Sequence, residues 1–341
     1  MHVLVAGSGG AAGWPEPGCR CASCLRAGPA RTAGRIVVGG VLELGAGIAP
    51  RVPAGYQVRG LDGGWDVTTP AGERLLYPAG PGAVPVPPAG AAPYDVAFLD
   101  LLGDPFQLGR LRAAGLIGTD TVTAVAFGDH RVPSAAELRR RCTFWQVEMP
   151  ADGQLIATAR SVVKSRPWRV LVLGGARSGK SEQAELRLAG EPDVTYVATG
   201  PAADADPDWA ARVAAHRARR PAWWRTAETT GLAEVLTSAR GALLIDGIGT
   251  WLTAVLTECG AWELGTEQNV EERTARLIAA WRQTEAHVVA VSDETGLGVV
   301  PATPAGRRFR DELGRLNQVL AAESEEAERV VAGRVLPLAA W

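Results

Sequence analysis

Short runs of apolar residues, each followed by turn residues and a helical pattern, recur through the second half of the chain. These runs are "RVLVL" from residue 169, "VTYVATG" from 194, "ALLIDGIG" from 242 and "HVVAVSDETG" from 287. A continuous apolar run is typical of a strand buried on both faces, and strands that alternate with helices form parallel sheets. The pattern therefore predicts an α/β domain with a mainly parallel sheet.

The first half of the chain has a less regular pattern. A strand pattern opens it in "MHVLVAGSGG", and another, "YDVAFLDLL", begins at residue 94 after the Pro- and Gly-rich stretch 78–93. Such a stretch holds neither a helix interior nor a central strand, so we expect a long loop there. A second break is expected near 161–169, "SVVKSRPWR". We therefore predict two domains, 1–164 and 165–341, as the length of the chain also suggests.

Composition and charge exclude several classes of protein. The hydrophobic fraction is 47%, the charged fraction is 21% and the net charge is −2, which favours a globular protein that binds neither nucleic acid nor an anionic membrane. No apolar run reaches the roughly 18 residues of a membrane span, and the first residues lack a secretion signal. Five cysteines, three of them at positions 19, 21 and 24, fit a reducing compartment. We expect a cytoplasmic protein.

The most specific motif lies at the start of the predicted second domain. The sequence "GGARSGKS" matches the phosphate-binding pattern G-x-x-x-x-G-K-[ST], and it lies between a strand pattern and a helical pattern that ends at Gly190. Its backbone N–H groups would surround an oligophosphate, its lysine would reach the β- and γ-phosphates, and its serine would bind Mg²⁺. The alternative is a glycine-rich turn that matches by chance. The predicted nucleotide-binding residues are Gly174, Gly175, Ala176, Arg177, Ser178, Gly179, Lys180 and Ser181.

A second acidic element is expected at the end of the apolar run from residue 242. Asp246 closes this run, and an acid at a strand end near a phosphate loop holds Mg²⁺ through water. An aspartate that only caps a helix or a turn remains the alternative. The loop and this acid together predict a nucleoside triphosphate site with Mg²⁺, but they name no substrate.

Six segments in a fixed order resemble one family of enzymes. They are the phosphate loop, "YVATG", residues 206–228, "LLIDGIGTWL", "VSDETGLGVVP" and the stretch from "RRFRD" to "LPL". This order, over about 169–338, resembles the bifunctional adenosylcobinamide kinase / adenosylcobinamide-phosphate guanylyltransferase. The resemblance implies phosphorylation of adenosylcobinamide with GTP or ATP. It also implies transfer of GMP from GTP, through a guanylyl-histidine, to give adenosylcobinamide-GDP in cobalamin biosynthesis, and a trimer as the homo-oligomer.

The resemblance points to His216 as the nucleophile. The family motif R-[VI]-x-x-H-x-x-x-R-P-x-x-W is matched here, and Pro221 is expected to stop the helix that carries it. Spacing of four places Asp208, Arg212, His216 and Arg220 in one stripe, where arginines would offset the charge of an α-phosphate. A solvated histidine on a basic helix face is the alternative. The matched residues are Arg212, Val213, His216, Arg220, Pro221 and Trp224.

Other positions match the family less closely. The resemblance places Glu228 near the guanine or nucleotide. Where the family shows N-E-V-G, this chain has Asp293 in the place of the amide, which changes hydrogen bonding there. Arginines at 307, 308 and 310 follow a loop that could close over phosphates, although two of the three are expected to be structural or solvated. Asn317 is as typical of helix packing as of ligand contact.

The first half resembles a different family. Glycines after the first strand suggest a dinucleotide site, but the "WPEPG" that follows cannot form the required helix. The pattern GWP-x-P-x-C-x-C-x-x-C instead resembles metallo-β-lactamase-fold hydrolases, which implies a shortened α+β domain and a structural Zn²⁺ held by Cys19, Cys21 and Cys24, with no obvious fourth ligand. His2 and His130 are the only histidines before residue 165, too few for a two-metal centre.

We therefore expect the first half to be catalytically silent. Asp100 and Asp104 are expected in turn and helix-capping roles rather than as metal ligands. Two other interpretations of the chain stay open. One is a nucleotide-dependent scaffold whose first half docks a partner, and the other is a residual metallohydrolase acting on a corrinoid phosphate.

Overall fold

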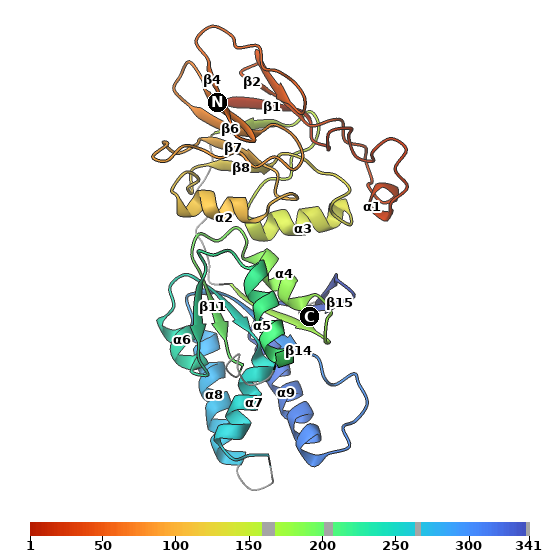
Figure 1. Cartoon of the computed structure of the whole chain (residues 1–341), viewed down its shortest axis with the longest axis vertical. Coiled ribbons are helices and arrows are strands. Elements are labelled where there is room, and N and C mark those ends of the chain that lie inside the picture. The colour runs from red at the N-terminus through yellow and green to blue at the C-terminus, as the bar shows by residue number, and fades with distance from the viewer. Residues whose placement is uncertain (159–167, 201–206, 263–266, 339–341) are drawn as a thin grey trace. The chain divides into compact units, whose positions relative to one another are not determined.

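The computed structural model describes residues 1–158, 168–200, 207–262 and 267–338. The chain divides into two compact units (Figure 1). Unit 1 comprises Met1–Lys164 with Ala189–Pro192, and unit 2 comprises Ser165–Leu188 with Asp193–Trp341. The segment 161–169, where the sequence predicts a boundary, lies largely outside the described residues.

Unit 1 contains two β-sheets that share one core. The four-stranded sheet is antiparallel, with the order β3 (Leu42–Gly45), β2 (Arg35–Val38), β1 (His2–Gly7) and β9 (Leu155–Ala157). The five-stranded sheet has the order β4 (Gln57–Leu61), β5 (Gly64–Thr68), β6 (Arg74–Pro78), β7 (Val96–Leu99) and β8 (Val122–Val125), with parallel pairing from β6 onward. Alternate residues of both sheets meet in one apolar cluster, so the sheets pack face to face.

Two helices cover the face of the mixed sheet that points away from β1 and β2 (Figure 1). They are α2 (Phe106–Ala113) and α3 (Ala135–Trp145), which bury Leu108 and Leu138. Ser134 caps α3, because its hydroxyl accepts a hydrogen bond from the Glu137 N–H at 3.2 Å. Between β6 and β7 the chain forms turns without a helix or a strand, as the Pro- and Gly-rich composition of 78–93 predicts.

The two aspartates of the "DLLGDP" stretch have different roles. Asp104 accepts a hydrogen bond from the Phe106 N–H at 3.0 Å at the start of α2, which is the predicted capping role. The prediction of a turn role is incomplete for Asp100. This side chain is fully buried and accepts hydrogen bonds of 2.7 and 2.9 Å from the Arg131 guanidinium. A buried carboxylate needs such a partner, so the pair holds two loops of unit 1 together.

Unit 2 contains a seven-stranded sheet. Its order is β12 (Arg225–Glu228), β11 (Val194–Ala198), β13 (Ala242–Asp246), β14 (His287–Asp293), β10 (Arg169–Gly174), β15 (Glu326–Val331) and β16 (Arg334–Leu338). All neighbours are parallel except β16, which pairs antiparallel with β15. The prediction of an α/β domain with a mainly parallel sheet is confirmed.

Helices cover both faces of this sheet. One apolar core joins alternate residues of the central strands to α6 (Leu232–Ser238), α7 (Ile248–Glu258), α8 (Glu267–Gln283) and α9 (Pro304–Ala322). The intervening strand residues face the opposite side, where α4 (Lys180–Arg187) and α5 (Pro207–Arg219) lie (Figure 1). Among the described residues, the helices are either too short or too polar to cross a membrane.

Candidate functional site

The predicted phosphate loop joins β10 to α4 at the carboxyl edge of the parallel sheet. Gly174 ends the strand and Lys180 begins the helix. Two glycines are required by the geometry: Gly179 has φ of 96°, and a Cβ on Gly174 would lie 2.4 Å from the Ser178 Oγ. Residues 175–177 of the loop are exposed, whereas Ser178 is buried. The loop therefore has the tight turn before a helix N-terminus that phosphate binding requires.

Two acidic strand ends lie beside this loop. Asp293 ends β14 directly opposite Gly174 of β10, and Asp246 ends the next strand, β13. Because the strands are parallel, their carboxyl ends meet at one edge of the sheet. The two carboxylates consequently reach the same pocket as the loop, at Lys180 and Ser181.

Lys180 already has an acidic partner in this structure. Its Nζ lies 2.9 Å from the Asp293 Oδ1 and also donates to the Gly175 carbonyl at 3.2 Å. The lysine is buried, whereas the Asp293 side chain is 43% exposed. The carboxylate at position 293, where the family resemblance leads us to expect an amide, therefore neutralises the lysine of the loop. An incoming phosphate must compete with that carboxylate.

Asp246 connects the loop to the predicted nucleophile. Its Oδ1 accepts from the Ser181 hydroxyl at 3.4 Å, at the long end of the hydrogen-bond range. Its Oδ2 accepts from the Tyr196 hydroxyl at 2.8 Å and lies 3.1 Å from Nδ1 of His216. Three residues from different elements therefore meet at the carboxylate of Asp246.

The environment of Asp246 favours its ionised form. Burial by itself raises the pKa of this carboxyl, but the hydrogen bond and charge of His216, the Tyr196 hydroxyl and the charge of Lys180 outweigh it, so the pKa is lowered. For Tyr196, burial and the nearby Asp246 charge raise the pKa, which keeps the phenol protonated as a donor. Asp246 is therefore an anion that accepts a hydrogen bond from the protonated Tyr196 hydroxyl.

The helix α5 is attached to the rest of the site at two further points. Arg219 donates to the buried Glu185 of α4 at 3.2 Å, and burial raises the pKa of that glutamate. The Arg220 guanidinium stacks 3.5 Å from the centre of the Tyr196 ring, and its Nε donates to the His216 carbonyl at 3.1 Å. These contacts place His216 over the carboxyl edge of the sheet.

Among the described residues, the charged group at hydrogen-bond distance of the His216 imidazole is the Asp246 carboxylate rather than a guanidinium. One nitrogen of Arg220 still suits an anion, since Nη1 is buried and has no hydrogen-bond partner among the described residues. The side chains of Asp208 and Arg212, predicted on the same stripe, lie outside the described residues.

The pocket between α5 and the strand ends has a volume of about 200 Å³. Lys180, Ser181, Asp246, His216 and Glu228 all line it, so the structure brings together the predicted loop, acid, nucleophile and base-contacting residue. Glu228 is exposed and forms an ion pair of 3.0 Å with Arg217 at the rim. It lies on β12, at the far side of the pocket from the phosphate loop.

Several predicted residues support the site without lining it. Asn317 accepts from the Ser292 hydroxyl at 2.6 Å and donates to the Asp293 carbonyl at 3.1 Å, so it packs α9 against the end of β14. Arg307 and Arg310 donate to backbone carbonyls of the loop before α9, at Ala302 and Gly296. These two arginines have the structural role that the sequence suggests.

Sequence reasoning missed two residues of this site. Tyr196 faces the pocket because its neighbour Val197 belongs to the core on the other face of the sheet, a signal present in the alternation along β11. Glu185 has no such signal, since a glutamate in the first turns of a helix is ordinarily solvated. Its burial follows from the position of α5.

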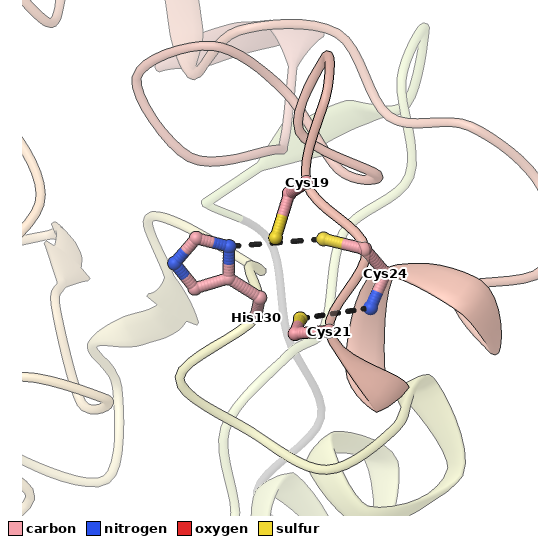
Figure 2. A group of neighbouring side chains, drawn as sticks. All are labelled: Cys19, Cys21, Cys24 and His130. Atoms are coloured by element: carbon pink, nitrogen blue, oxygen red, sulfur yellow. Dashed lines mark hydrogen bonds between the residues drawn. The ribbon is translucent and has the colours of Figure 1, made fainter.

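A second group of functional side chains lies in unit 1. The thiols of Cys19, Cys21 and Cys24 and the imidazole of His130 offer ligand atoms that all lie within 4.8 Å of one another (Figure 2). The Cys24 Sγ is 3.7 Å from the His130 Nδ1, and that nitrogen is 2.9 Å from a Glu16 carboxylate oxygen. The sequence offered no fourth ligand near the cysteines. His130 was missed because it lies far along the chain.

The four ligands come from two separate loops. The cysteines lie before and within the short helix α1 (Ala22–Leu25), and His130 lies in the loop between β8 and α3. The Cys24 N–H donates to the Cys21 Sγ at 3.4 Å, and this bond is the largest cause that lowers the pKa of Cys21. Burial raises the pKa of Cys24 to about 11. All the cysteines are free thiols.

Comparison with known proteins gives consistent matches over unit 2. Residues 170–338 match the family model described as cobinamide kinase / cobinamide phosphate guanyltransferase. The bifunctional adenosylcobalamin biosynthesis protein CobU of Salmonella typhimurium is 39% identical over 175 residues, which is 48% of this chain and 96% of that protein. CobP of Pseudomonas aeruginosa is 42% identical over 50% of this chain and 96% of its own length. CobU of Escherichia coli is 38% identical, with 48% and 96% covered.

Proposed function

The chain belongs, through residues 170–338, to the cobinamide kinase / cobinamide phosphate guanyltransferase family, and we propose that the pocket at the carboxyl edge of its parallel sheet carries both reactions. The chain is accordingly a bifunctional enzyme of adenosylcobalamin biosynthesis that phosphorylates adenosylcobinamide and then transfers GMP to the product. One observation supports the assignment of both steps to this pocket. Lys180 of the phosphate loop and His216 both line it and are linked through Asp246 and Ser181.

The kinase step uses the loop 174–181. The substrate hydroxyl oxygen attacks the γ-phosphorus, the bond between that phosphorus and the β–γ bridging oxygen breaks, and the hydroxyl proton is released to water. Charge accumulates on oxygens that Lys180 and the α4 N-terminus stabilise, which lowers the barrier without covalent chemistry by the protein. Lys180 leaves Asp293 to meet the phosphate.

Mg²⁺ fits the oxygen atoms at this position. The Ser181 hydroxyl and the Asp246 carboxylate lie 3.4 Å apart next to the loop, and Mg²⁺ prefers such hard oxygen ligands and retains waters. We propose that these two residues hold it, either directly or through water. When bound, the ion neutralises phosphate charge in both reactions.

The guanylyltransfer step uses His216 as the nucleophile. A histidine nitrogen attacks the α-phosphorus of GTP, and the bond to the α–β bridging oxygen breaks to release pyrophosphate. A phosphate oxygen of adenosylcobinamide phosphate then attacks the guanylyl phosphorus and releases the histidine. Arg220 lines the same pocket, and its guanidinium is proposed to face the phosphates of the bound nucleotide. Glu228, on the far strand, is proposed to contact the guanine.

A GTP analogue with a β,γ-imido bridge tests whether one pocket serves both steps. The analogue cannot donate its γ-phosphate but keeps an intact α–β bond, so it should guanylylate the enzyme while acting as a competitive inhibitor of the kinase. The inhibition constant should equal the dissociation constant of the analogue in the Lys180-containing pocket. Guanylylation without any inhibition of the kinase would place the two reactions in different sites.

For unit 1 we propose a structural Zn²⁺ held by Cys19, Cys21, Cys24 and His130. Three thiolates and an imidazole form a common tetrahedral zinc set, in which ligand atoms lie about 3.8 Å apart when Zn–S bonds are about 2.3 Å. The observed grouping within 4.8 Å suits that geometry (Figure 2). The ion would join the cysteine loop to the loop that carries His130.

Metal analysis of the intact chain tests this site. Purified protein should contain about one Zn²⁺ per chain, and His130→Ala should lower its zinc affinity by at least about tenfold. His2→Ala is the matched control, because His2 is the other histidine of unit 1 and lies on β1 away from the cluster. A metal-free wild-type chain that stays folded in the presence of chelators would contradict the proposal.

Three broader properties are also proposed. The two face-to-face sheets with α2 and α3 outside support a shortened metallo-β-lactamase-like fold for unit 1, without the histidines for catalytic metals. Free cysteines favour a cytoplasmic location. The resemblance of unit 2 to its family suggests a homo-oligomer, for which a trimer is the expected form, and sedimentation velocity would measure it.

A further inference from the structure

We propose that Asp246 is a positioning residue that fixes the tautomer of His216, so that the Nε2 atom of the imidazole becomes guanylylated. The proposal rests on the proposed role of His216 as nucleophile and goes further, since it names the reacting atom and the group that selects it. The observation that carries it is the 3.1 Å separation between the His216 Nδ1 and the Asp246 Oδ2.

The direction of this hydrogen bond follows from the chemistry of its two partners. An ionised carboxylate only accepts hydrogen bonds, so the imidazole nitrogen beside it must carry the proton. The Tyr196 hydroxyl donates to the same Oδ2 at 2.8 Å, which confirms that this oxygen faces donors. His216 is therefore held with hydrogen on Nδ1. In a neutral ring the lone pair is then on Nε2.

The carboxylate that selects the tautomer is itself held firmly. Asp246 ends a central strand, and its side chain is only 12% exposed. Its Oδ1 is directed to Ser181 of the phosphate loop, and its Oδ2 is directed to Tyr196 and His216. Each oxygen thus has a separate function. One faces the nucleotide loop and the other orients the nucleophile, so one side chain contacts both His216 and the loop.

The other ring nitrogen is available to react. Within the part of the chain that the structure describes, the hydrogen-bond contact of the His216 ring is made through Nδ1 alone. The ring lines the pocket together with Lys180 and Ser181, and its side chain is 23% exposed. Nε2 is on the side of the ring away from Asp246. An α-phosphate bound along the loop can therefore approach it.

The two chemical steps balance with this assignment. In the first step the Nε2 lone pair forms a bond to the α-phosphorus, and the α–β bridging oxygen leaves with the electron pair of its bond. The proton on Nδ1 stays in place, so the guanylylated ring is cationic and the adjacent Asp246 carboxylate offsets its charge. In the second step a substrate phosphate oxygen binds the phosphorus and the N–P electron pair returns to Nε2. The ring ends in the same tautomer.

Nitrogen NMR of the intact, uniformly folded enzyme with ¹⁵N-labelled histidine tests the proposal. In protein prepared without nucleotide or added Mg²⁺, the neutral His216 ring should show hydrogen on Nδ1 and a non-protonated Nε2. After reaction with GTP, ³¹P–¹⁵N coupling should appear at Nε2. A linkage at Nδ1, or hydrogen on Nε2 in the free enzyme, would overturn the proposal while leaving His216 as the nucleophile.

Two variants separate positioning from a general structural role. Asp246→Asn keeps the shape but removes the charge, so His216 should lose its single tautomer and guanylylation should slow by at least about 10²-fold. Tyr196→Phe removes the other donor to Oδ2 and should retain the tautomer and the Nε2 linkage. An unchanged tautomer in Asp246→Asn would overturn the proposal. Absence of any label on His216 in the wild type would instead refute the proposed function.

Discussion

Lys180 of the phosphate loop and Asp293 at the end of β14 form an ion pair of 2.9 Å. The family resemblance leads us to expect an amide at position 293, so this pairing depends on a departure of this chain from the family pattern. The nucleotide must displace the carboxylate from the lysine and tolerate its charge near the phosphates.

Replacement of this acid should strengthen nucleotide binding. Asp293→Asn removes one negative charge beside the phosphates, and the dissociation constant for a non-hydrolysable GTP analogue should fall by about fivefold or more at low salt. Calorimetry at two ionic strengths measures this dissociation constant. Glu294→Gln, which removes a charge from the neighbouring residue, is the control. Weaker binding by Asp293→Asn would show that the carboxylate assists the nucleotide, for example as a metal ligand.

The ion pair between α4 and α5 should affect the two activities unequally. Arg219→Ala leaves the buried Glu185 without its partner and loosens the helix that carries His216, whereas the phosphate loop stays on β10 and α4. Guanylylation should therefore fall by more than the kinase rate, by about tenfold relative to it. Arg225→Ala, which breaks an exposed pair with Asp193 at a residue that does not line the pocket, is the control for the loss of one positive charge from unit 2. Equal losses in both reactions would contradict this account of α5.

A buried ion pair on the sheet of unit 2 should dominate local stability. Arg187 donates to Glu328 at 2.7 Å and pairs with Glu326 at 2.6 Å, and both Arg187 and Glu328 are buried. Arg187→Ala removes the guanidinium that neutralises the buried Glu328 carboxylate of β15, which should cost about 3–5 kcal/mol. Arg225→Ala, which breaks the exposed pair with Asp193, should cost about 1 kcal/mol or less. Denaturant unfolding measures the free energy of unfolding of both variants. Similar losses of stability in the two would contradict the idea that burial makes the Arg187 pair the stronger one.

Glu137 in the first turn of α3 provides a pH test of stability. Burial alone raises its pKa, but hydrogen bonds from Arg140 and Arg141 outweigh burial and the pKa is lowered from the ordinary value of 4.5. The pair therefore stabilises unit 1 above pH 4.5, and this contribution is lost as the pH falls through the folded-state pKa. The destabilisation caused by Glu137→Gln should shrink as the pH is lowered through that range. Amide hydrogen exchange in α3 measures the difference in stability between the wild type and Glu137→Gln. A difference that does not change with pH would contradict the lowered pKa of Glu137.

Much of unit 2 could be predicted from the sequence because its signals are local. Continuous apolar runs predicted the strands that form the parallel sheet, and the glycine spacing of 174–181 predicted a tight turn before a helix. Asp246 was recognised because an acid at the end of a buried strand reaches the sheet edge where the loop lies. The family motif points to His216, whose role as nucleophile stays a prediction, but the sequence did not indicate the Asp246 carboxylate beside its ring.

The relationships that the sequence did not predict are contacts over long distances along the chain. Nothing near Cys19, Cys21 and Cys24 indicates that His130 joins them, because only the folded loops bring it there. In the same way, the contact of His216 with Asp246 depends on where α5 packs against α4. Periodicity specifies which face of an element is buried, but not which polar groups meet at its ends.

Labelling of one variant tests most directly whether His216 separates the two activities. His216→Asn keeps a polar side chain of similar reach and leaves Lys180 and the loop intact. With α-labelled GTP, this variant should form no acid-labile guanylyl-enzyme and no adenosylcobinamide-GDP, while phosphorylation of adenosylcobinamide should continue at a substantial fraction of the wild-type rate. Lys180→Ala should instead lower the rate of adenosylcobinamide phosphorylation by several powers of ten. A labelled His216→Asn enzyme would place the nucleophile elsewhere, and the loss of both activities in a folded variant would contradict the division of roles proposed for this pocket.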